Sequence, residues 1–574
     1  MPAVKRLPLA AIGGLIVVLA IVLSAGGFSL GGSTTSPSHR PDADPGSGAV
    51  ATHAPPASGG LASQRPAATG PASSSAASPA PSSAASPDTP AASPAAPAEP
   101  PVLASTPVVP VTQFRATTTT ATAEQVASIL VGKSTRYDAL ELVESEAPAI
   151  LDALGLRETA DAAPTGKLVL AADAATLTRD LAANRDRLAF LRAADVTPAV
   201  RALGWEGKAL FGTQRVRKAA DWPLNAELPQ TGDAFDPSAT WTLFAGGDIL
   251  LDRGVYETVR VKGKGVDFPF DGGTAEITGH CKDCSPLGWD TPYTKRTGNK
   301  GAMRRLIEGA DLAIANFENP APDRWRWHTS KTIFSADPGI IEGIADAGID
   351  WVGLANNHIG DQGRRGVLQT IRNIEKYDLA HAGAGKDVTA ARAPSWFTVG
   401  DTRIAILAYD AINKPYHATA SLAGSAAFTT RNVTADVRKA RAAGADVVIV
   451  FPHWGIEYRY APTATQRAQA KAIIEAGADM IIGNHAHYAA AMEVHHGKPI
   501  WYALGNFVFD QTWSEPTMEG ITLELTFHGG ELVQARMRPH LILDKAQPNF
   551  LDPAGDGKAV LGPIWKASKG LLPW

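Results

Sequence analysis

The stretch DWVGLANNHIGDQG, residues 350–363, joins a short apolar run directly to a polar cluster. The run over residues 350–354 has the length and composition of a buried strand, and two asparagines and His358 follow almost at once. Two carboxamides and an imidazole at a strand end seldom serve packing alone. The stretch therefore predicts a functional site at the edge of an α/β sheet.

The same pattern recurs through the C-terminal half of the chain. Short β-branched apolar runs alternate with helical patterns, which predicts an α/β fold. Expected helices cover Ile340–Ala347, Val367–Tyr377 and Gln466–Ala476. The further expected strands are Trp241–Phe244, Leu312–Ala315, Arg403–Ala408, Val447–Phe451, Met480–Ile482 and Ile500–Leu504.

Most of these strands end on a polar cluster. Because the carboxyl ends of neighbouring strands in an open α/β sheet converge on one crevice, clusters spread over about 260 positions are expected to meet there. Glycine stands beside several of them, as a crowded site with close backbone approach requires. The clusters are Gly246-Gly247-Asp248, Asn316-Phe317-Glu318-Asn319, Asn356-Asn357-His358-Ile359-Gly360-Asp361, His453-Trp454-Gly455-Ile456-Glu457, Gly483-Asn484-His485-Ala486-His487 and Gly505-Asn506.

The clusters contain Asp, Glu, Asn and His without a thiolate. This mixture of oxygen and imidazole ligands suits Mn, Fe or Zn, and there are enough candidates for two ions. Two ions about 4 Å apart would clamp a phosphoryl group during in-line attack. The residue types therefore favour a phosphoesterase site.

Taken singly, several clusters have ordinary structural explanations. Asp248 follows two glycines and is compatible with a turn. Glu318 and Asn319 are compatible with a loop cap before a proline, and His453 with a core histidine beside Trp454. The whole series, each member at a strand end and in order, favours a single metal site.

Residues 242–543 resemble the CapA family of capsule or poly-γ-glutamate synthesis proteins, within the calcineurin-like metallophosphatase superfamily. The resemblance rests on the motifs GDILLDRG, ANFENP, GLANNHIGDQG, PHWGIEY, GNHAHY and YALGNFVFD. It implies a metallophosphatase-like layered domain of β-sheets and α-helices that holds two divalent metal ions, Mn, Fe or Zn. The motifs specify the family more closely than they specify a substrate.

The resemblance also implies residue roles. Asp248 and His487 would bind one metal, and Glu318 would approach both metals. The second metal would be bound by Asn357, His453 and His485. His358 would be the proton donor or the electrostatic partner of the phosphoryl group, oriented by Asp361. The complete implied ligand set is Asp248, Glu318, Asn319, Asn357, His453, His485 and His487.

Two features of the first motif stay open. Arg253 is expected either to meet a phosphate oxygen or to be a surface residue near a helix start. Ordinary members of the superfamily carry Asp-x-His at the first strand, whereas Leu250 stands two positions after Asp248. One metal would therefore lack its usual imidazole, which puts metal occupancy and turnover in question.

The N-terminus predicts export. Lys5 and Arg6 precede an uncharged apolar run from Leu7 to about Phe28, long enough to span a bilayer. The positive-inside rule then places the later residues outside the cell membrane, in a single-pass topology. The alternative is a cleaved signal peptide, for which Ser24-Ala25-Gly26 supplies small residues.

Composition divides the rest of the chain. We expect an anchor or signal at residues 1–28, a disordered Pro/Ala/Ser-rich linker at 29–111 and a C-terminal extension at 546–574. Between them we expect an accessory α/β domain at 112–238 and the CapA-like domain at 239–545. In the accessory domain, helical patterns start at Thr122, Tyr137 and Leu177, and two short apolar runs, at residues 168–172 and 209–211, are candidate strands.

The chain has two cysteines, Cys281 and Cys284. An exported location favours a local disulfide between them, because a zinc knuckle needs two more ligands and only His280 is adjacent.

Charge and motifs together leave two functional hypotheses. The formal net charge of −4 argues against nucleic acid as a partner. The first hypothesis is an extracytoplasmic metal-dependent phosphoesterase, acting on an envelope polymer or a phosphorylated intermediate. The second is a non-hydrolytic, polymer-binding subunit of a capsule assembly or export complex, with other subunits of that complex as partners.

Overall fold

The structure, a computed structural model, describes residues 102–232 and 234–573. The predicted anchor and most of the predicted linker lie outside these residues. The described residues belong to one compact unit. Within the described residues, no helix is both long enough and apolar enough to cross a membrane.

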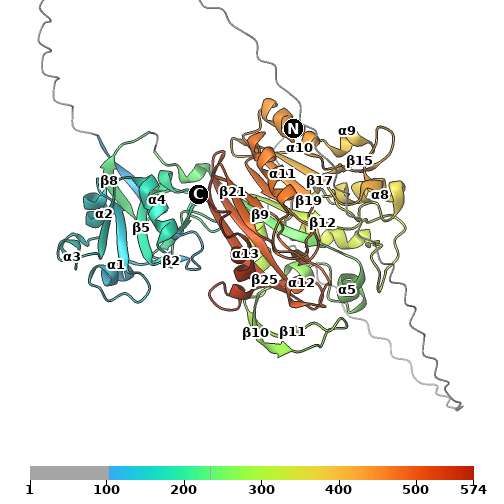
Figure 1. The fold of residues 1–574 in the computed structure, drawn as a ribbon, viewed down its shortest axis with the longest axis horizontal. Helices are drawn as coiled ribbons and strands as arrows, with labels where there is room; N and C mark the ends of the chain where they lie inside the picture. Colours follow the sequence, from blue (N-terminus) through green and yellow to red (C-terminus); the bar gives the residue numbers. More distant parts are fainter. Residues whose placement is uncertain (1–101, 233, 574) are drawn as a thin grey trace, which may run out of the picture. The chain divides into compact units, whose positions relative to one another are not determined.

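The main domain is a mixed α/β fold with layered sheets (Figure 1). Leu243 and Ile314 of the larger sheet share one core cluster with Ile404 and Ile449 of the smaller sheet, so these two faces pack together. A second cluster joins the opposite face of the larger sheet to α6, α7 and α8, and a third joins the smaller sheet to α10 and α11. The result is a helix, sheet, sheet, helix order of layers.

The larger sheet has ten strands among the described residues. Its centre is β9, which pairs in parallel with β12 and β23 and antiparallel with β24. In spatial order the strands are β11 (Thr291–Gly298), β10 (Thr274–Cys281), β26 (Gln547–Phe550), β25 (Glu531–Leu543), β24 (Glu519–His528), β9 (Thr240–Ile249), β12 (Leu312–Phe317), β13 (Trp351–Gly353) and β14 (Ala380–Ala382), with β23 (Asn506–Val508) beside β9.

The smaller sheet has a parallel centre, as buried strands rich in Val and Ile require. In spatial order its strands are β16 (Ser395–Val399), β17 (Thr402–Asp410), β19 (Val447–His453), β20 (Met480–Ile482), β22 (Lys498–Trp501) and β21 (Met492–His495). The helices that cover the two sheets are α5 (Arg253–Tyr256), α6 (Ala302–Glu308), α7 (Ile341–Asp346), α8 (Gly363–Glu375), α10 (Thr430–Ala442) and α11 (Ala464–Glu475).

The strand predictions for this domain are confirmed, with small changes of bounds. The last expected strand is shifted, since β22 ends at Trp501 rather than at Leu504. The strands belong to two sheets, which agrees with the layered domain that the resemblance implied but differs from the single open sheet used to explain the convergence of the strand ends. The polar clusters therefore converge because the two sheets pack with their carboxyl edges together.

The accessory domain has a sheet of β4 (Leu168–Ala171), β3 (Ala139–Val143), β5 (Arg187–Arg192), β1 (Leu103–Gln113) and β6 (Val200–Ala202), with β8 (Asn225–Pro229) also paired to β1. A two-residue pair, β2 (Thr120–Ala121) and β7 (Gly204–Trp205), lies beside it. Its helices include α1 (Ala123–Leu130), α2 (Ala147–Ala153) and α4 (Ala174–Ala183). An α/β accessory domain is what the sequence predicted.

Two helical predictions in that domain are partly wrong. The pattern from Tyr137 begins with β3, and the pattern from Leu177 ends in β5. Both strands are apolar and largely buried, so their periodicity cannot distinguish a strand from a buried helix. The run at residues 209–211 is irregular rather than a strand.

Two domain boundaries also differ from expectation. β1 begins at Leu103, inside the range assigned to the linker, and its second half is buried. At the other end, β26 pairs with β25, and α13 (Gly557–Ala567) packs on the core through Val560 and Ile564. Residues 546–567 are therefore part of the main domain. Cys281 and Cys284 form the expected disulfide, at the tip of the β10–β11 hairpin.

Candidate metal centre

The polar clusters meet where the two sheets join. Within the larger sheet, Asp248 is paired with both Asn316 of β12 and Asn506 of β23. Within the smaller sheet, His453 forms a bridge to Asn484, just before His485. A Cβ added at Gly247 would lie 1.9 Å from the carbonyl oxygen of Gly505, so glycine is required for this close approach.

One group of side chains surrounds the Nε2 atom of His453. The Asn357 Oδ1 atom lies 2.7 Å from it, His485 Nδ1 lies 3.2 Å from it and Glu318 Oε1 lies 3.3 Å from it. Glu318, His453 and His485 offer ligand atoms close enough together to hold one metal ion. The sequence placed these four residues at the second metal, and the structure brings them together.

A second group shares Glu318. Asp248, Glu318 and His487 also offer ligand atoms close enough to hold one ion, and all three residues are buried. His487 Nδ1 lies 3.7 Å from Asp248 Oδ2, and its Nε2 lies 4.0 Å from Glu318 Oε1. The carboxylate of Glu318 thus belongs to both groups, as expected of a residue that approaches two metals.

The electrostatics of these groups fit bound cations. Among the described residues, neither carboxylate oxygen of the fully buried Glu318 has a hydrogen-bond partner. Burial raises the pKa of Glu318 to about 8, and burial followed by the charge of Glu318 raises the pKa of Asp248 well above its usual value. Because buried charges are normally paired or bound to metal, divalent cations match this donor set.

The histidines are poised as neutral ligands. Burial lowers the pKa of His487 to about 3, and it also lowers the pKa values of His453 and His485. A metal ligand must be a neutral imidazole, so these shifts favour ligation over protonation. His485 and His487 also have positive φ angles, 91° and 55°, an uncommon conformation that concentrates at functional sites.

His358 lies beside the metal groups and is oriented as expected. Its Nδ1 atom is 2.9 Å from Asp361 Oδ2, and its side chain is 13% exposed. The same carboxylate oxygen accepts the backbone N–H of Phe334, whose ring centroid lies 4.2 Å from that of His358. These contacts hold the imidazole at its Nδ1 atom and against one face of its ring.

Arg253 is not an ordinary surface residue. Its guanidinium forms a 2.5 Å ion pair with Asp510 and lies 4.9 Å from the ring centroid of Phe334, on which His358 also packs. Its side chain is 15% exposed. Arg253 is thus held near His358, with its charge shared with a carboxylate.

Asn319 and Leu250 are engaged in structural contacts. The Asn319 side-chain oxygen accepts the backbone N–H of Leu251, and its amide donates to Pro320 O. Asn319 therefore caps the chain beside the site rather than offering an oxygen to it. Leu250 is fully buried in a small apolar cluster with Phe334 and Phe509.

Two residues of the site were absent from the predicted set. Asn316 donates from its amide to Asp248 Oδ1 at 2.7 Å, and that amide also lies 3.2 Å from His453 Nδ1. Asn506 Oδ1 lies 2.9 Å from His487 Nδ1. Both orient a predicted ligand through its remaining polar atom. The signal was available, since residues i and i+2 of a strand share a face and Asn316 stands two before Glu318.

Comparison with known proteins gives a family match for the part of the chain that holds this site. Residues 242–511 match the family described as bacterial capsule synthesis protein PGA_cap. The matched range contains every residue of the two metal groups. It also confirms the resemblance to CapA proteins.

Three relatives of this chain are named as capsule, PGA or polyglutamine synthesis proteins. The capsule biosynthesis protein CapA of Bacillus anthracis is 34% identical over 36% of this chain and 53% of its own length. The PGA biosynthesis protein CapA of Bacillus subtilis is 31% identical over 38% of this chain and 60% of its own length. A probable polyglutamine synthesis accessory protein of Mycobacterium tuberculosis is 27% identical over 47% and 74%. The chain thus spans little more than half the length of the two Bacillus relatives.

Solved structures give weaker matches. The calcineurin-like phosphoesterase YfkN of Bacillus subtilis matches with a TM-score of 0.29 and 14% identity, over 58% of this chain and 97% of that one. The NAD nucleotidase of Haemophilus influenzae matches with a TM-score of 0.31 and 11% identity, over 58% and 56%. TM-scores this low carry no argument about function.

Proposed function

We propose that this chain is an extracytoplasmic, metal-dependent phosphoesterase of the metallophosphatase type, acting in cell-envelope polymer metabolism. The observation that carries the proposal is Glu318, a buried carboxylate that belongs to two ligand groups and has no hydrogen bond to any described residue. Such a group is costly without a cation beside it. The relatives named for capsule and PGA biosynthesis support the envelope setting.

The metal ligands divide into two sets. Asp248 and His487 would hold one divalent ion, Asn357, His453 and His485 would hold the other, and Glu318 would contact both. When bound, a pair of divalent ions would polarise a phosphoryl group and supply a nucleophile at neutral pH. The mixture of carboxylate, carboxamide and imidazole suits Mn, Fe or Zn.

The other site residues position and neutralise the substrate. Asp361 accepts the Nδ1–H of His358 and so fixes the orientation of the imidazole. His358 is then the group that donates a proton to the departing oxygen or stabilises charge on the phosphoryl group. Arg253, paired with Asp510, would meet a phosphate oxygen only by sharing its charge with that carboxylate.

The extracytoplasmic location is supported by sequence alone. Lys5 and Arg6 precede the apolar run that starts at Leu7, and this arrangement favours export of everything after it. A fusion of a topology reporter to the C-terminus tests it. Reporter activity in the cytoplasm would contradict the location and leave the chemistry of the site untouched.

The chemistry is tested with the full chain, purified in detergent and loaded with Mn or Fe. We expect hydrolysis of a model phosphodiester or of a lipid-linked phosphodiester. The matched control is the His358→Ala/Asn357→Ala double variant, in which turnover should be lost. Equal rates for the two proteins on every substrate would refute the proposal.

A second candidate is a polymer-binding subunit without hydrolytic activity. The observation that favours it is Leu250. This buried apolar side chain stands where ordinary members of the superfamily carry a metal-binding histidine after the first strand. Deletion of the gene should then remove surface polymer, and an Asp248→Ala/His485→Ala variant should restore it fully. Failure of that variant to restore the polymer supports the enzyme instead.

A further inference from the structure

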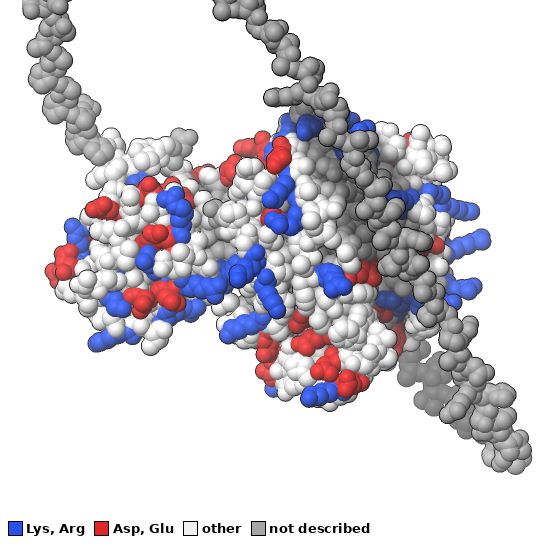
Figure 2. Space-filling view, viewed as in Figure 1, with Lys and Arg blue, Asp and Glu red and all other residues white. Residues whose placement is uncertain are grey.

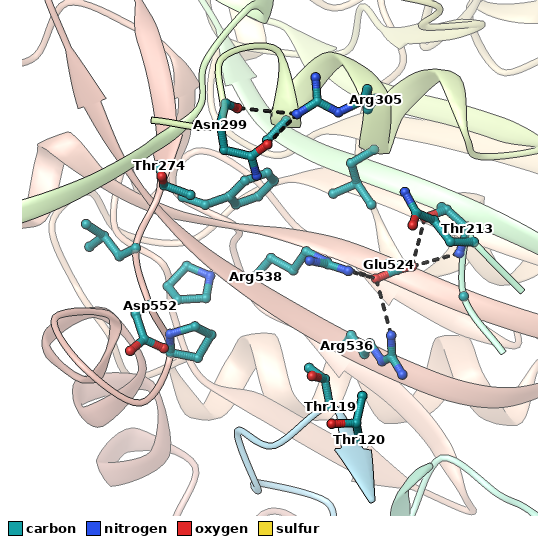
Figure 3. A pocket seen from close by; sticks show the side chains of 18 of the residues that line it. Thr119, Thr120, Thr213, Thr274, Asn299, Arg305, Glu524, Arg536, Arg538 and Asp552 are labelled. Atoms are coloured by element: carbon teal, nitrogen blue, oxygen red, sulfur yellow. Dashed lines mark hydrogen bonds and ion pairs between the residues drawn. The ribbon is translucent and has the colours of Figure 1, made fainter. Parts of the chain in front are cut away.

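A large cleft lies between the accessory domain and the sheet edge of the main domain, and it uses none of the residues of the metal groups. Its volume is about 950 Å³. One wall comes from residues 204–214 and from Thr119 and Thr120, and the other comes from β24, β25 and β10 (Figure 3). A cleft of this size accommodates a ligand of several chemical units rather than a single ion.

The floor of the cleft is basic. Arg536 and Arg538 stand two residues apart on β25 and so share one face, opposite Glu524 of β24. Arg538 donates twice to Glu524 Oε2, at 2.8 and 2.6 Å, and Arg536 Nη1 lies 4.0 Å from the same oxygen. Although burial opposes it, these two arginines lower the pKa of Glu524 to about 2. Glu524 therefore stays ionised and is the counter-charge of both Arg536 and Arg538.

A third guanidinium adds positive charge to this region, and it forms no ion pair with a carboxylate of the described residues. Arg201, on β6, lines a smaller adjoining cavity together with Arg536, Arg538 and Arg115. Burial, followed by the charges of Arg536 and Arg538, lowers the pKa of Arg201 to about 9. The buried Nε atoms of Arg201 and Arg536 have no hydrogen-bond partner within the described part of the chain. Figure 2 shows Lys and Arg side chains gathered over this region, between β2 and β25.

The other acids that line the cleft bond to partners other than these arginines. Glu276 pairs with Lys295 at 3.3 Å. Asp556 accepts the backbone N–H of Ile277 at 2.7 Å, and Asp552 accepts that of Ala554 at 3.0 Å. Three buried or half-buried guanidiniums thus face one committed carboxylate, Glu524.

We propose that this cleft, together with the smaller cavity that adjoins it at Arg536 and Arg538, is a binding site for an oligomeric ligand that carries oxyanions, either carboxylates or phosphates. Arg201, Arg536 and Arg538 bind those groups. The planar guanidinium matches both kinds of oxyanion through paired N–H donors. The unpaired Nε atoms of Arg201 and Arg536 would gain partners. The site is separate from the proposed phosphoesterase centre and does not depend on it.

The test is calorimetric titration of the full chain in detergent with two probes, a glutamate hexapeptide and tripolyphosphate, at low and high salt. We expect binding of at least one probe, and which one binds identifies the oxyanion. Arg201→Gln and Arg536→Gln should each weaken that binding about 10-fold or more. Arg431→Gln, which removes an exposed arginine outside the cleft, should leave it unchanged.

Two controls make a negative result decisive. The side-chain Nε of Arg201 has no hydrogen-bond partner among the described residues, and substitution leaves its backbone pairing with Thr112 in place. Thermal unfolding of the variant should therefore match that of the parent protein. The Asp248→Ala/His485→Ala variant should bind the probe normally. The proposal is wrong if neither probe binds, or if both arginine variants bind as tightly as Arg431→Gln.

Discussion

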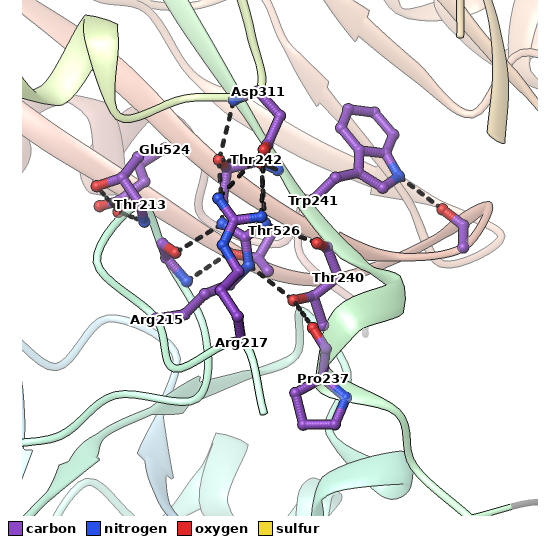
Figure 4. A network of polar contacts seen from close by, with 12 residues as sticks. Thr213, Arg215, Arg217, Pro237, Thr240, Trp241, Thr242, Asp311, Glu524 and Thr526 are labelled. Carbon is purple, nitrogen blue, oxygen red and sulfur yellow. Dashed lines mark hydrogen bonds and ion pairs between the residues drawn. The ribbon is translucent and has the colours of Figure 1, made fainter. Parts of the chain in front are cut away.

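Two buried charged groups in this molecule differ in whether their polar atoms have hydrogen-bond partners. Arg215 and Asp311 form an ion pair of 2.9 Å, and every part of it is hydrogen-bonded: Arg215 also donates to Thr240 O and Oγ1, while Asp311 accepts the N–H and hydroxyl of Thr242 (Figure 4). Glu318 is as deeply buried, yet neither oxygen has such a partner among the described residues.

The difference separates structure from function. The Arg215 network clamps the segment after β7 against the start of β9, and its satisfied groups leave nothing for a ligand. Glu318 is compensated only when something outside the chain binds it, because an isolated buried charge is too costly to keep. A buried charge that lacks hydrogen-bond partners, rather than burial itself, marks the ligand site.

The largest expected effect follows substitution of Glu318. Glu318→Gln removes the negative charge shared by both ligand groups, so we expect metal affinity to fall by at least about 100-fold, more than for a residue that only orients a ligand. The metal-free variant should unfold no earlier than the metal-free parent, since the carboxylate makes no hydrogen bond to lose. Metal titration and thermal unfolding with and without chelator check both statements.

The opposite behaviour is expected for the structural pair. Asp311→Ala leaves Arg215 buried without a counter-charge, and we expect a loss of about 3 kcal/mol in the free energy of unfolding with metal binding unchanged. Arg217→Gln removes a partner that is 54% exposed and should cost much less. Denaturant unfolding measures both, and loss of metal with Asp311→Ala would break the distinction.

An intermediate effect is expected at His358. His358→Ala should lower turnover about 100-fold while leaving metal content unchanged, because its contacts are to Asp361 and Phe334. Asp361→Asn should lower turnover less, since the imidazole keeps a side-chain partner at the same position. A drop in metal content with His358→Ala would instead make this residue a ligand.

The smallest effect is expected at Asn316. Its amide donates to Asp248 Oδ1, so Asn316→Ala should weaken metal binding about 10-fold by releasing that carboxylate. Asn319→Ala is the matched control, because the Asn319 side chain bonds only to backbone groups of Leu251 and Pro320. Equal metal affinities for the two variants would contradict the role given to Asn316.

Most of this domain could be predicted from the sequence, because its apolar strands are followed by Asp, Asn or His residues that are uncommon at such positions. β19, Val447–His453, is a plain apolar run that stops at a histidine, and pattern alone locates both strand and ligand. The prediction for Asn319 rested on its adjacency to Glu318, which does not indicate direction, and its side chain instead bonds to backbone groups of Leu251 and Pro320. The pattern from Tyr137 failed because ALELV, the sequence of β3, is buried throughout and carries no clear period.

Other features depend on contacts that no local pattern carries. The division of the strands between two sheets comes from packing of residues far apart in the chain, such as Ile314 and Ile404. The cleft beside Arg536 likewise combines residues 201 and 536, brought together by docking of the accessory domain.

Metal stoichiometry of the purified full chain tests the central claim most directly. Elemental mass spectrometry after saturation with Mn, Fe or Zn and removal of excess ion should give two ions per chain, with Glu318→Gln giving fewer than one. One ion or none per chain in the parent protein, or two ions in the Glu318→Gln variant, would contradict the assignment of Glu318 as the carboxylate shared by two metals.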